Sequence, residues 1–137
     1  MIEDPKWKKF EKLVHKIQQD LAPGAEIKLN DSIFDSDANK MRQVDISIRA
    51  QVGQFPLLII VECKDHKDPV DITIVESFIS KVAKLKANKG AIFSSSGYTE
   101  AAIATAKKSG INTYSVADGE NANWQEYIQK VPLLVER

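Results

Sequence analysis

The stretch over residues 56–65, Pro-Leu-Leu-Ile-Ile-Val-Glu-Cys-Lys-Asp, constrains the fold more than any other part of the chain. Its five consecutive aliphatic residues indicate a β-strand that is buried on both faces. Glu62 and Lys64 follow the aliphatic run, and they point to the same face because side chains alternate along a strand. Ionised groups at the end of a buried strand are costly unless they are paired. The sequence therefore places a carboxylate and an ammonium group together at the end of a central strand.

A second strand is predicted over residues 42–52, where apolar and polar residues alternate strictly. Gly53 and Gln54 then form a turn that joins it to the strand over residues 56–64 as an antiparallel hairpin. Asp45 lies near the start of the first strand, and Glu62 and Lys64 lie at the end of the second. The hairpin is thus expected to bring these three side chains together at one end of the sheet.

The other segments predict helices on both sides of these strands. A helix over residues 6–21 carries an apolar stripe at helical spacing, and a strand over 25–34 and an acidic turn over 35–39 follow it. A helix over 70–87, a strand over 90–93, a helix ending near residue 108 and a strand over 111–116 form a crossover unit with parallel strands. A last helix is expected around residues 124–131. We therefore predict an α/β fold with a mixed central sheet flanked by helices, in a single domain over residues 1–137. The apolar stripe consists of Trp7, Phe10, Leu13, Val14, Ile17 and Leu21.

Two features allow two interpretations each, and a third has one. Glu11 lies at the edge of the apolar stripe, so it is either a solvated helix carboxylate or a side chain at the boundary of the core. The turn over residues 94–97, Ser-Ser-Ser-Gly, precedes a helix and either caps it, together with Thr99, or holds a phosphate. Lys81 and the other lysines of the second helix are expected to lie mostly away from its apolar face.

Composition excludes several classes of protein. The 137 residues contain 43% hydrophobic residues, enough for a core, and 19 basic residues balance 19 acidic ones. This balance argues against a protein that coats nucleic acid nonspecifically. The single cysteine, Cys63, excludes an intrachain disulfide and suits a reducing cytoplasm. No apolar run approaches the roughly 20 residues of a membrane span, so we expect no membrane segment.

The predicted cluster suits a metal ion bound by oxygen ligands. Asp45 and Glu62 offer hard oxygen ligands that favour Mg²⁺ or Mn²⁺, and the backbone carbonyl of Cys63 can add a third. Lys64 beside the metal would position or deprotonate a water, or neutralise charge on a phosphate. These residues favour metal-assisted phosphodiester hydrolysis. The competing interpretation is that Glu62 and Lys64 form only an ion pair.

The order of these motifs resembles the PD-(D/E)xK nuclease superfamily and, within it, the Mrr-like type IV restriction endonucleases. The resemblance rests on Arg-Gln-Val-Asp at 42–45, Val-Glu-Cys-Lys at 61–64, Phe-Glu-Lys-Leu-Val at 10–14 and the segment over 89–98. It implies a restriction-endonuclease-like three-layer fold and a Mg²⁺-dependent endodeoxyribonuclease that cuts DNA. It also implies that Asp45 and Glu62 are metal ligands and Lys64 the catalytic lysine. Glu11 would match the first-helix glutamate of some members, including archaeal Holliday-junction resolvases, and would join both the catalytic and the metal-binding residues.

The chain departs from the Mrr-like pattern at two places in its sequence. Many members have glutamine where Glu62 stands, and a glycine-rich stretch where this chain has residues 39–43. Members of this group usually carry a separate DNA-recognition domain, and none fits into this chain. Sequence specificity is therefore either absent or supplied by a separate recognition subunit or domain. Cutting both strands of a duplex calls for two active sites and favours a homodimer. The alternative function is a catalytically inactive nuclease-fold module that binds DNA or a protein partner.

Overall fold

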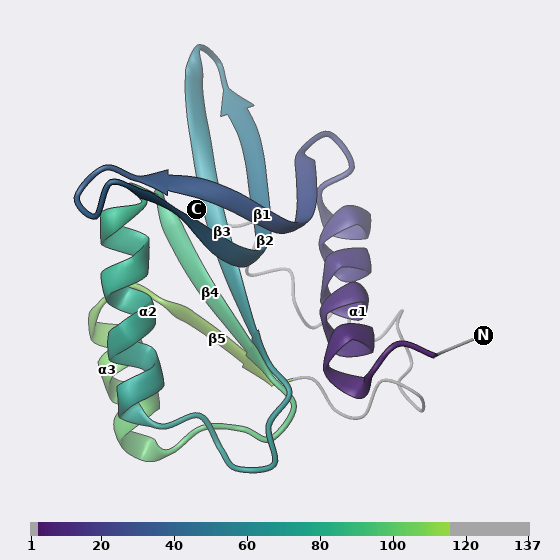
Figure 1. The fold of residues 1–137 in the computed structure, drawn as a ribbon, viewed down its shortest axis with the longest axis vertical. Coiled ribbons are helices and arrows are strands. Elements are labelled where there is room, and N and C mark those ends of the chain that lie inside the picture. The colour runs from purple at the N-terminus through teal and green to yellow at the C-terminus, as the bar shows by residue number, and fades with distance from the viewer. Residues whose placement is uncertain (1–2, 116–137) are drawn as a thin grey trace.

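The computed structural model of the chain describes residues 3–115, and within them three helices and five strands form an α/β fold (Figure 1). The strands form one sheet in the order β1-β2-β3-β4-β5. Strands β1 to β3 pair antiparallel and β3 to β5 pair parallel, so the mixed sheet predicted from sequence is confirmed. The predicted helix over 124–131 lies outside the described residues. The elements are α1 (Lys6–Leu21), β1 (Glu26–Asp35), β2 (Lys40–Val52), β3 (Phe55–Lys64), α2 (Ile72–Lys84), β4 (Lys89–Ser94), α3 (Glu100–Lys108) and β5 (Asn112–Ser115).

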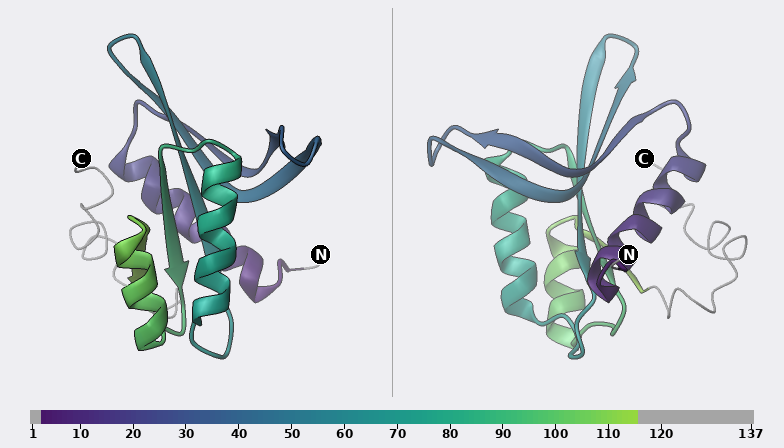
Figure 2. Two further views of the ribbon diagram at one scale, coloured as in Figure 1. Left: turned by 90° about the vertical axis from the view of Figure 1, so that its left-hand side faces the viewer. Right: turned by 45° about the vertical axis from the view of Figure 1, so that its right-hand side comes forward.

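Helices cover both faces of the sheet and make the predicted three layers. Helix α1 packs on one face, and α2 and α3 pack together on the other (Figures 1 and 2). Each face has its own hydrophobic cluster. The cluster beneath α1 lies between that helix and the sheet and includes Val14, Ile46 and Val61. The cluster beneath α2 lies between α2, α3 and the sheet and includes Ile60, Phe78 and Ile92. Gly90 lets α2 lie close to β4, because a Cβ atom there would stand 2.6 Å from Val82 Cγ2. Across residues 3–115, no helix is long and apolar enough to cross a membrane.

Strands β2 and β3 form the predicted hairpin through a two-residue turn. Val52 pairs with Phe55, and Gly53 adopts a left-handed φ of 62°, as tight hairpin turns require. The pairing continues down to Ile46 and Val61 and ends there. Strand β2 itself continues to Lys40, two residues beyond the predicted start. Asp45 therefore lies in the middle of its strand, and the expectation that it stands near a strand end is wrong.

Strand β2 bends at Asp45. Val44 packs in the cluster beneath α2, whereas Ile46, two residues later, packs in the cluster beneath α1. Residues two apart on a regular strand share a face, so the strand twists strongly between them. Asn30, whose neighbours on β1 pair with the neighbours of Asp45, has a positive φ of 54°. Between Lys40 and this bend, β2 is no longer paired with β3, and together with β1 it sweeps toward α2 (Figure 2).

The acidic turn predicted over residues 35–39 is confirmed: a turn over residues 36–39 joins β1 to β2, and Asp35 holds it in place. Asp35 ends β1 and is fully buried. Its carboxylate accepts hydrogen bonds from the amides of Asp37 and Ala38, at 3.0 and 3.1 Å, and from the Arg42 guanidinium at 3.3 Å. Burial acts to raise the pKa of Asp35, but these donors outweigh it and hold the pKa below its ordinary value.

The serine turn joins two loops at the carboxyl ends of the parallel strands. Ser95 Oγ donates to Asp65 Oδ1 at 2.6 Å, and Ser96 Oγ donates to the Asp68 carbonyl at 2.7 Å. Thr99 is the residue that caps α3, since its hydroxyl accepts the Ala102 amide. The serine side chains are thus occupied in holding the β3–α2 and β4–α3 loops together. The loop bearing Asp65 is fixed directly after Lys64.

Candidate active site

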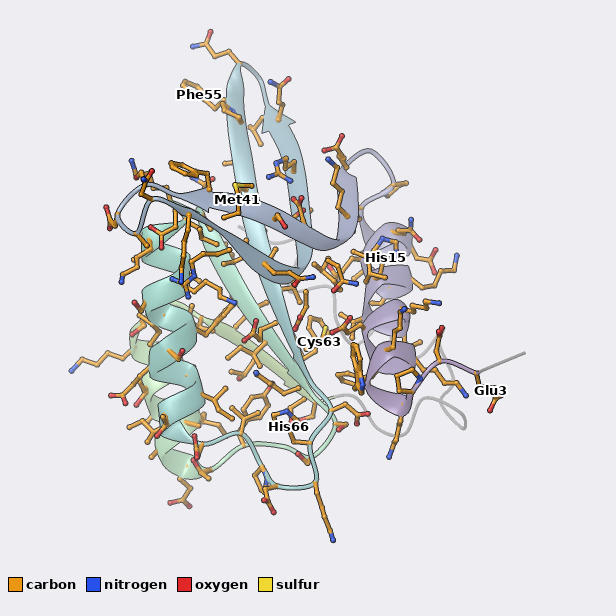
Figure 3. The ribbon with its side chains drawn as sticks, in the orientation of Figure 1. Glu3, His15, Met41, Phe55, Cys63 and His66 are labelled. Carbon is orange, nitrogen blue, oxygen red and sulfur yellow. The ribbon has the colours of Figure 1, made fainter. Side chains whose placement is uncertain are left out.

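A cleft of about 440 Å³ opens where β2 separates from β3. Side chains from α1, β1, β2, β3, α2 and the loop after β3 line it, and Cys63 and His66 mark its position in Figure 3. The four side chains predicted from sequence, Glu11, Asp45, Glu62 and Lys64, all line this cleft. The structure therefore brings the predicted residues together, although their catalytic roles remain predictions.

Asp45 occupies the point at which the two strands part. The β2–β3 ladder ends at the pair Ile46–Val61, and the next register position would set Asp45 opposite Glu62. Asp45 Oδ2 instead accepts a hydrogen bond from the Cys63 amide at 2.8 Å, so the side chain replaces a missing ladder bond. Burial, and next the charge of Glu62, raise the pKa of Asp45, while the Cys63 amide and the lysines oppose this.

Glu62 is held by two lysines. Lys64 Nζ lies 3.4 Å from Glu62 Oε2, and Lys81 Nζ lies 3.7 Å from Glu62 Oε1. All three side chains are at most 23% exposed, so solvent screens these ion pairs only in part. The Glu62–Lys64 ion pair of the competing interpretation therefore exists. It lies inside the cleft beside two further carboxylates rather than isolated on a surface.

Lys81 is the functional candidate that sequence reasoning missed. It comes from α2, and besides Glu62 it contacts β2, donating to the Gln43 carbonyl at 3.1 Å. The expectation that this lysine lies away from the core side of α2 is wrong, because the bent part of β2 passes next to the helix. A signal was present in the spacing: Lys81 follows the core residue Phe78 by three positions, and residues three apart share a helix side.

Glu11 reaches the cleft from α1 and settles the question that its helix position left open. It is 7% exposed, so it is not a solvated carboxylate. Burial, the charge of Asp45 and a hydrogen bond with Asp45 raise the pKa of Glu11 to about 7. Within residues 3–115 its Oε1 atom is buried and has no hydrogen-bond partner. A buried carboxylate oxygen without a donor, next to a second carboxylate, is stabilised by a proton or by a bound cation.

Cys63 separates the cleft from the core beneath α1. Its side chain packs against the cluster containing Phe10 and Val61, on the opposite side of β3 from Ile60. It is partly exposed and lines the cleft. Burial, and to a lesser extent the charges of Asp45 and Glu11, raise the pKa of the thiol well above its ordinary value, so the thiol stays neutral.

The donor set fits a divalent cation in part. Glu11, Asp45 and Glu62 supply carboxylate oxygens. The charges of Asp45 and Glu62 act to raise the pKa of Glu11, the charge of Glu62 acts to raise that of Asp45, and a metal ion would relieve that repulsion. Among residues 3–115, however, no group of three or more His, Cys, Asp or Glu side chains is arranged to hold a metal by itself. Two carboxylates, a backbone carbonyl such as that of Cys63 and water would complete the coordination that Mg²⁺ prefers.

Comparison with known protein families identifies the family of this chain. The sequence matches the family Mrr_cat, described as "Restriction endonuclease", over residues 2–121. The chain belongs to this restriction endonuclease family. The resemblance inferred from the motifs is thereby confirmed, and the chain is a nuclease domain of the Mrr_cat family. No curated protein matches the sequence.

Solved structures share the fold of this Mrr_cat domain at low sequence identity. Can2 from Sulfobacillus thermosulfidooxidans, in complex with cyclic tetra-adenylate, matches with a TM-score of 0.69 and 15% identity over 96% of this chain and 36% of Can2. AF1548, a protein of unknown function, matches with a TM-score of 0.65 and 17% identity over 81% of this chain and 58% of its own. MspJI restriction endonuclease, in complex with a 27-mer oligonucleotide, gives a TM-score of 0.52 and 11% identity over 88% of this chain and 31% of MspJI. The Mrr_cat domain thus spans less than two thirds of each of these proteins, and the likeness concerns the fold.

Glu11→Gln should make the metal-free Mrr_cat domain more stable at pH 8 and leave it unchanged at pH 4. The folded-state pKa of Glu11, about 7, lies above its ordinary value of 4.5, so the native state binds the proton more tightly than the unfolded state. Wild-type stability should therefore fall as pH rises from about 4.5 to about 7, by on the order of 1–3 kcal/mol after allowance for screening.

Urea unfolding in EDTA at pH 4, 6 and 8 measures this difference directly. Asp20→Asn is the matched control, because Asp20 is an exposed carboxylate of the same helix whose partner is Lys16 at the surface. The stability of this control should follow the wild-type profile over the whole pH range. A Glu11→Gln profile that also runs parallel to wild type would contradict the shifted pKa.

Proposed function

We propose that this domain is a metal-dependent endonuclease that hydrolyses phosphodiester bonds in DNA. The observation that supports it most is the convergence of Glu11, Asp45 and Glu62 with Lys64 and Lys81 in one cleft of a restriction endonuclease fold. Carboxylates hold the metal that such chemistry uses, and the lysines supply positive charge for a phosphate. Mg²⁺ is the expected ion, and Mn²⁺ has the same preference for oxygen ligands.

Each side chain has a distinct role in this proposal. Asp45 and Glu62 would hold the metal, with Glu11 and the Cys63 carbonyl as further ligands. When bound, the metal polarises the phosphate and lowers the pKa of water. Lys64 orients the attacking water and, with Lys81, stabilises the negative charge that develops on the phosphate oxygens. The Asp45–Cys63 hydrogen bond fixes the carboxylate before substrate arrives.

The same proposal covers the partners and the setting. A DNA-recognition function is expected to be supplied by another domain or subunit. Cleavage of both strands of a duplex is expected to need a homodimer. The single cysteine, whose thiol stays neutral, fits an enzyme that works in the reducing cytoplasm.

Incubation of the purified chain with supercoiled plasmid, branched DNA and single-stranded DNA tests the function. Cleavage is expected with Mg²⁺ or Mn²⁺ and should stop in EDTA. Cleavage that continues in EDTA would contradict the metal-dependent mechanism. Binding to DNA without cleavage under any divalent ion would favour the inactive module instead.

Lys81→Ala should lower kcat/KM for DNA cleavage roughly 10–100-fold, because a charge-assisted contact of this kind contributes about 1.5–3 kcal/mol. Lys84→Ala is the matched control, since Lys84 lies on the same helix and is exposed. Lys81→Arg keeps the charge and should retain most of the activity. Equal rates for Lys81→Ala and Lys84→Ala would remove Lys81 from the site.

A further inference from the structure

Trp7 is exposed at the mouth of the candidate active site. The apolar stripe of α1 predicted that this side chain packs in the core, but it is 53% exposed, whereas Phe10, Val14 and Ile17 of the same stripe are buried. Trp7 lines the cleft together with Glu11, which follows it by one helical turn. A large aromatic side chain that is not used by the core and borders a site for substrate is a candidate for ligand contact.

The charges around Trp7 suit a phosphate backbone. Lys6 and Lys8 flank it in sequence, and neither forms an ion pair within residues 3–115. The next lysines of the helix are less available, because Lys9 and Lys12 pair with Glu3 and Asp4. Among residues 3–115, the two lysines next to Trp7 in sequence are thus the lysines of α1 that form no ion pair and can bind an anion. Aromatic rings beside such cations are how proteins hold single-stranded nucleic acid.

The rim of the cleft also carries side chains that can form hydrogen bonds with the polar edges of nucleotide bases. Asn30, Gln43 and His66 line it alongside Trp7 and offer amide and imidazole donors and acceptors. At about 440 Å³ the cleft lies within the roughly 300–1,000 Å³ of small-ligand pockets. It is suited to one or two nucleotides rather than to the width of a duplex.

We infer that Trp7 stacks on an unpaired base next to the scissile phosphate, so that the preferred substrate is single-stranded or locally unpaired DNA. In a paired duplex the faces of each base are covered by its neighbours and are closed to an indole ring. A single strand, a flap or a branch point presents such a face freely. This inference rests on the proposed nuclease function and names the substrate class of the same site.

Tryptophan fluorescence tests the contact in solution. The chain has one other tryptophan, Trp124, so a Trp124→Phe variant leaves Trp7 as the only indole. Lys64→Ala is added to prevent cleavage during the titration with Mg²⁺. An oligothymidylate single strand should quench the emission of Trp7, and a blunt duplex of the same length should quench it much less.

Matched substitutions measure what the ring contributes. Trp7→Ala should weaken binding of the single strand roughly tenfold or more, and Trp7→Phe should restore most of it because a ring remains. Phe55→Ala is the control, since Phe55 is 63% exposed and lies at the far tip of the β2–β3 hairpin (Figure 3). Circular dichroism confirms that each variant is folded, and the fluorescence of the variant that keeps Trp7 gives an answer even if Trp7→Ala does not fold.

The outcomes separate this inference from the proposed function. Unquenched Trp7 emission, or equal loss of single-strand and duplex binding in Trp7→Ala, overturns the stacking role even if the enzyme cuts DNA. Quenching and selective loss of single-strand binding support the stacking role even if no DNA is cut. Quenching of Trp7 and selective loss of single-strand binding, found together with no cleavage under any divalent ion, would overturn only the nuclease proposal.

Discussion

Replacing Lys64 with alanine should lower the rate of DNA cleavage roughly 10²–10³-fold, as expected when one preorganised cation is removed from a developing negative charge. The fold should survive, because Glu62 keeps Lys81 as a counter-ion at 3.7 Å and is not left as an unpaired buried charge. Cleavage rates under Mg²⁺ and thermal melting curves of the two proteins measure the two effects separately.

Cys63→Ala is the natural control for Lys64→Ala, because the two residues are adjacent and face different surroundings. Cys63 packs against the cluster beneath α1, so its truncation should cost about 1 kcal/mol of stability and leave cleavage nearly unchanged. Retention of full cleavage by Lys64→Ala would remove the lysine from the mechanism. Loss of the fold in that variant would show that the lysine acts as a structural ion pair.

Asp45→Asn should abolish metal-dependent cleavage, by roughly 10³-fold or more, since a catalytic metal contributes several kcal/mol to stabilising the transition state. The fold should remain, because the asparagine carbonyl oxygen can still accept the Cys63 amide. The pKa of Asp45 is raised by burial, so losing its charge should leave stability at pH 8 equal or higher.

Calorimetric titration with Mg²⁺, cleavage assays and melting curves test this prediction together. Asp45→Ala provides the comparison: it loses the charge and also the acceptor for the Cys63 amide, so it should be less stable than Asp45→Asn. Wild-type cleavage by Asp45→Asn would place the metal site elsewhere.

Local sequence patterns were enough to predict the β2–β3 hairpin and the three site residues Asp45, Glu62 and Lys64. Strict alternation over residues 42–52 and the aliphatic run before Glu62 specify two paired strands, and Gly53 specifies the turn between them. Once that hairpin is known, its register brings Asp45 next to Glu62 and Lys64. These relationships depend on contacts between residues that are close in sequence, so they can be predicted from one sequence alone.

Contacts between segments that are far apart in sequence could not be predicted in the same way. The burial of Glu11 depends on where α1 crosses the sheet, and the contact of Lys81 depends on the bend of β2 at Asp45. Neither the crossing nor the bend has a marker in the local pattern. Trp7 fits the apolar stripe of α1 but lies beyond the part of the helix that the sheet covers, which helical periodicity alone does not reveal.

The position of the hairpin turn has a consequence for protein engineering. Asp45, Glu62 and Lys64 all lie below the turn at Gly53, and the pairing between Val52–Phe55 and Ile46–Val61 fixes their relative positions. A one-residue insertion within either strand would reverse the faces of all the side chains beyond it. An insertion at the turn itself leaves the register intact. A foreign recognition module spliced in after Gly53 would therefore extend the protein without moving the carboxylates and lysine that we propose cut DNA.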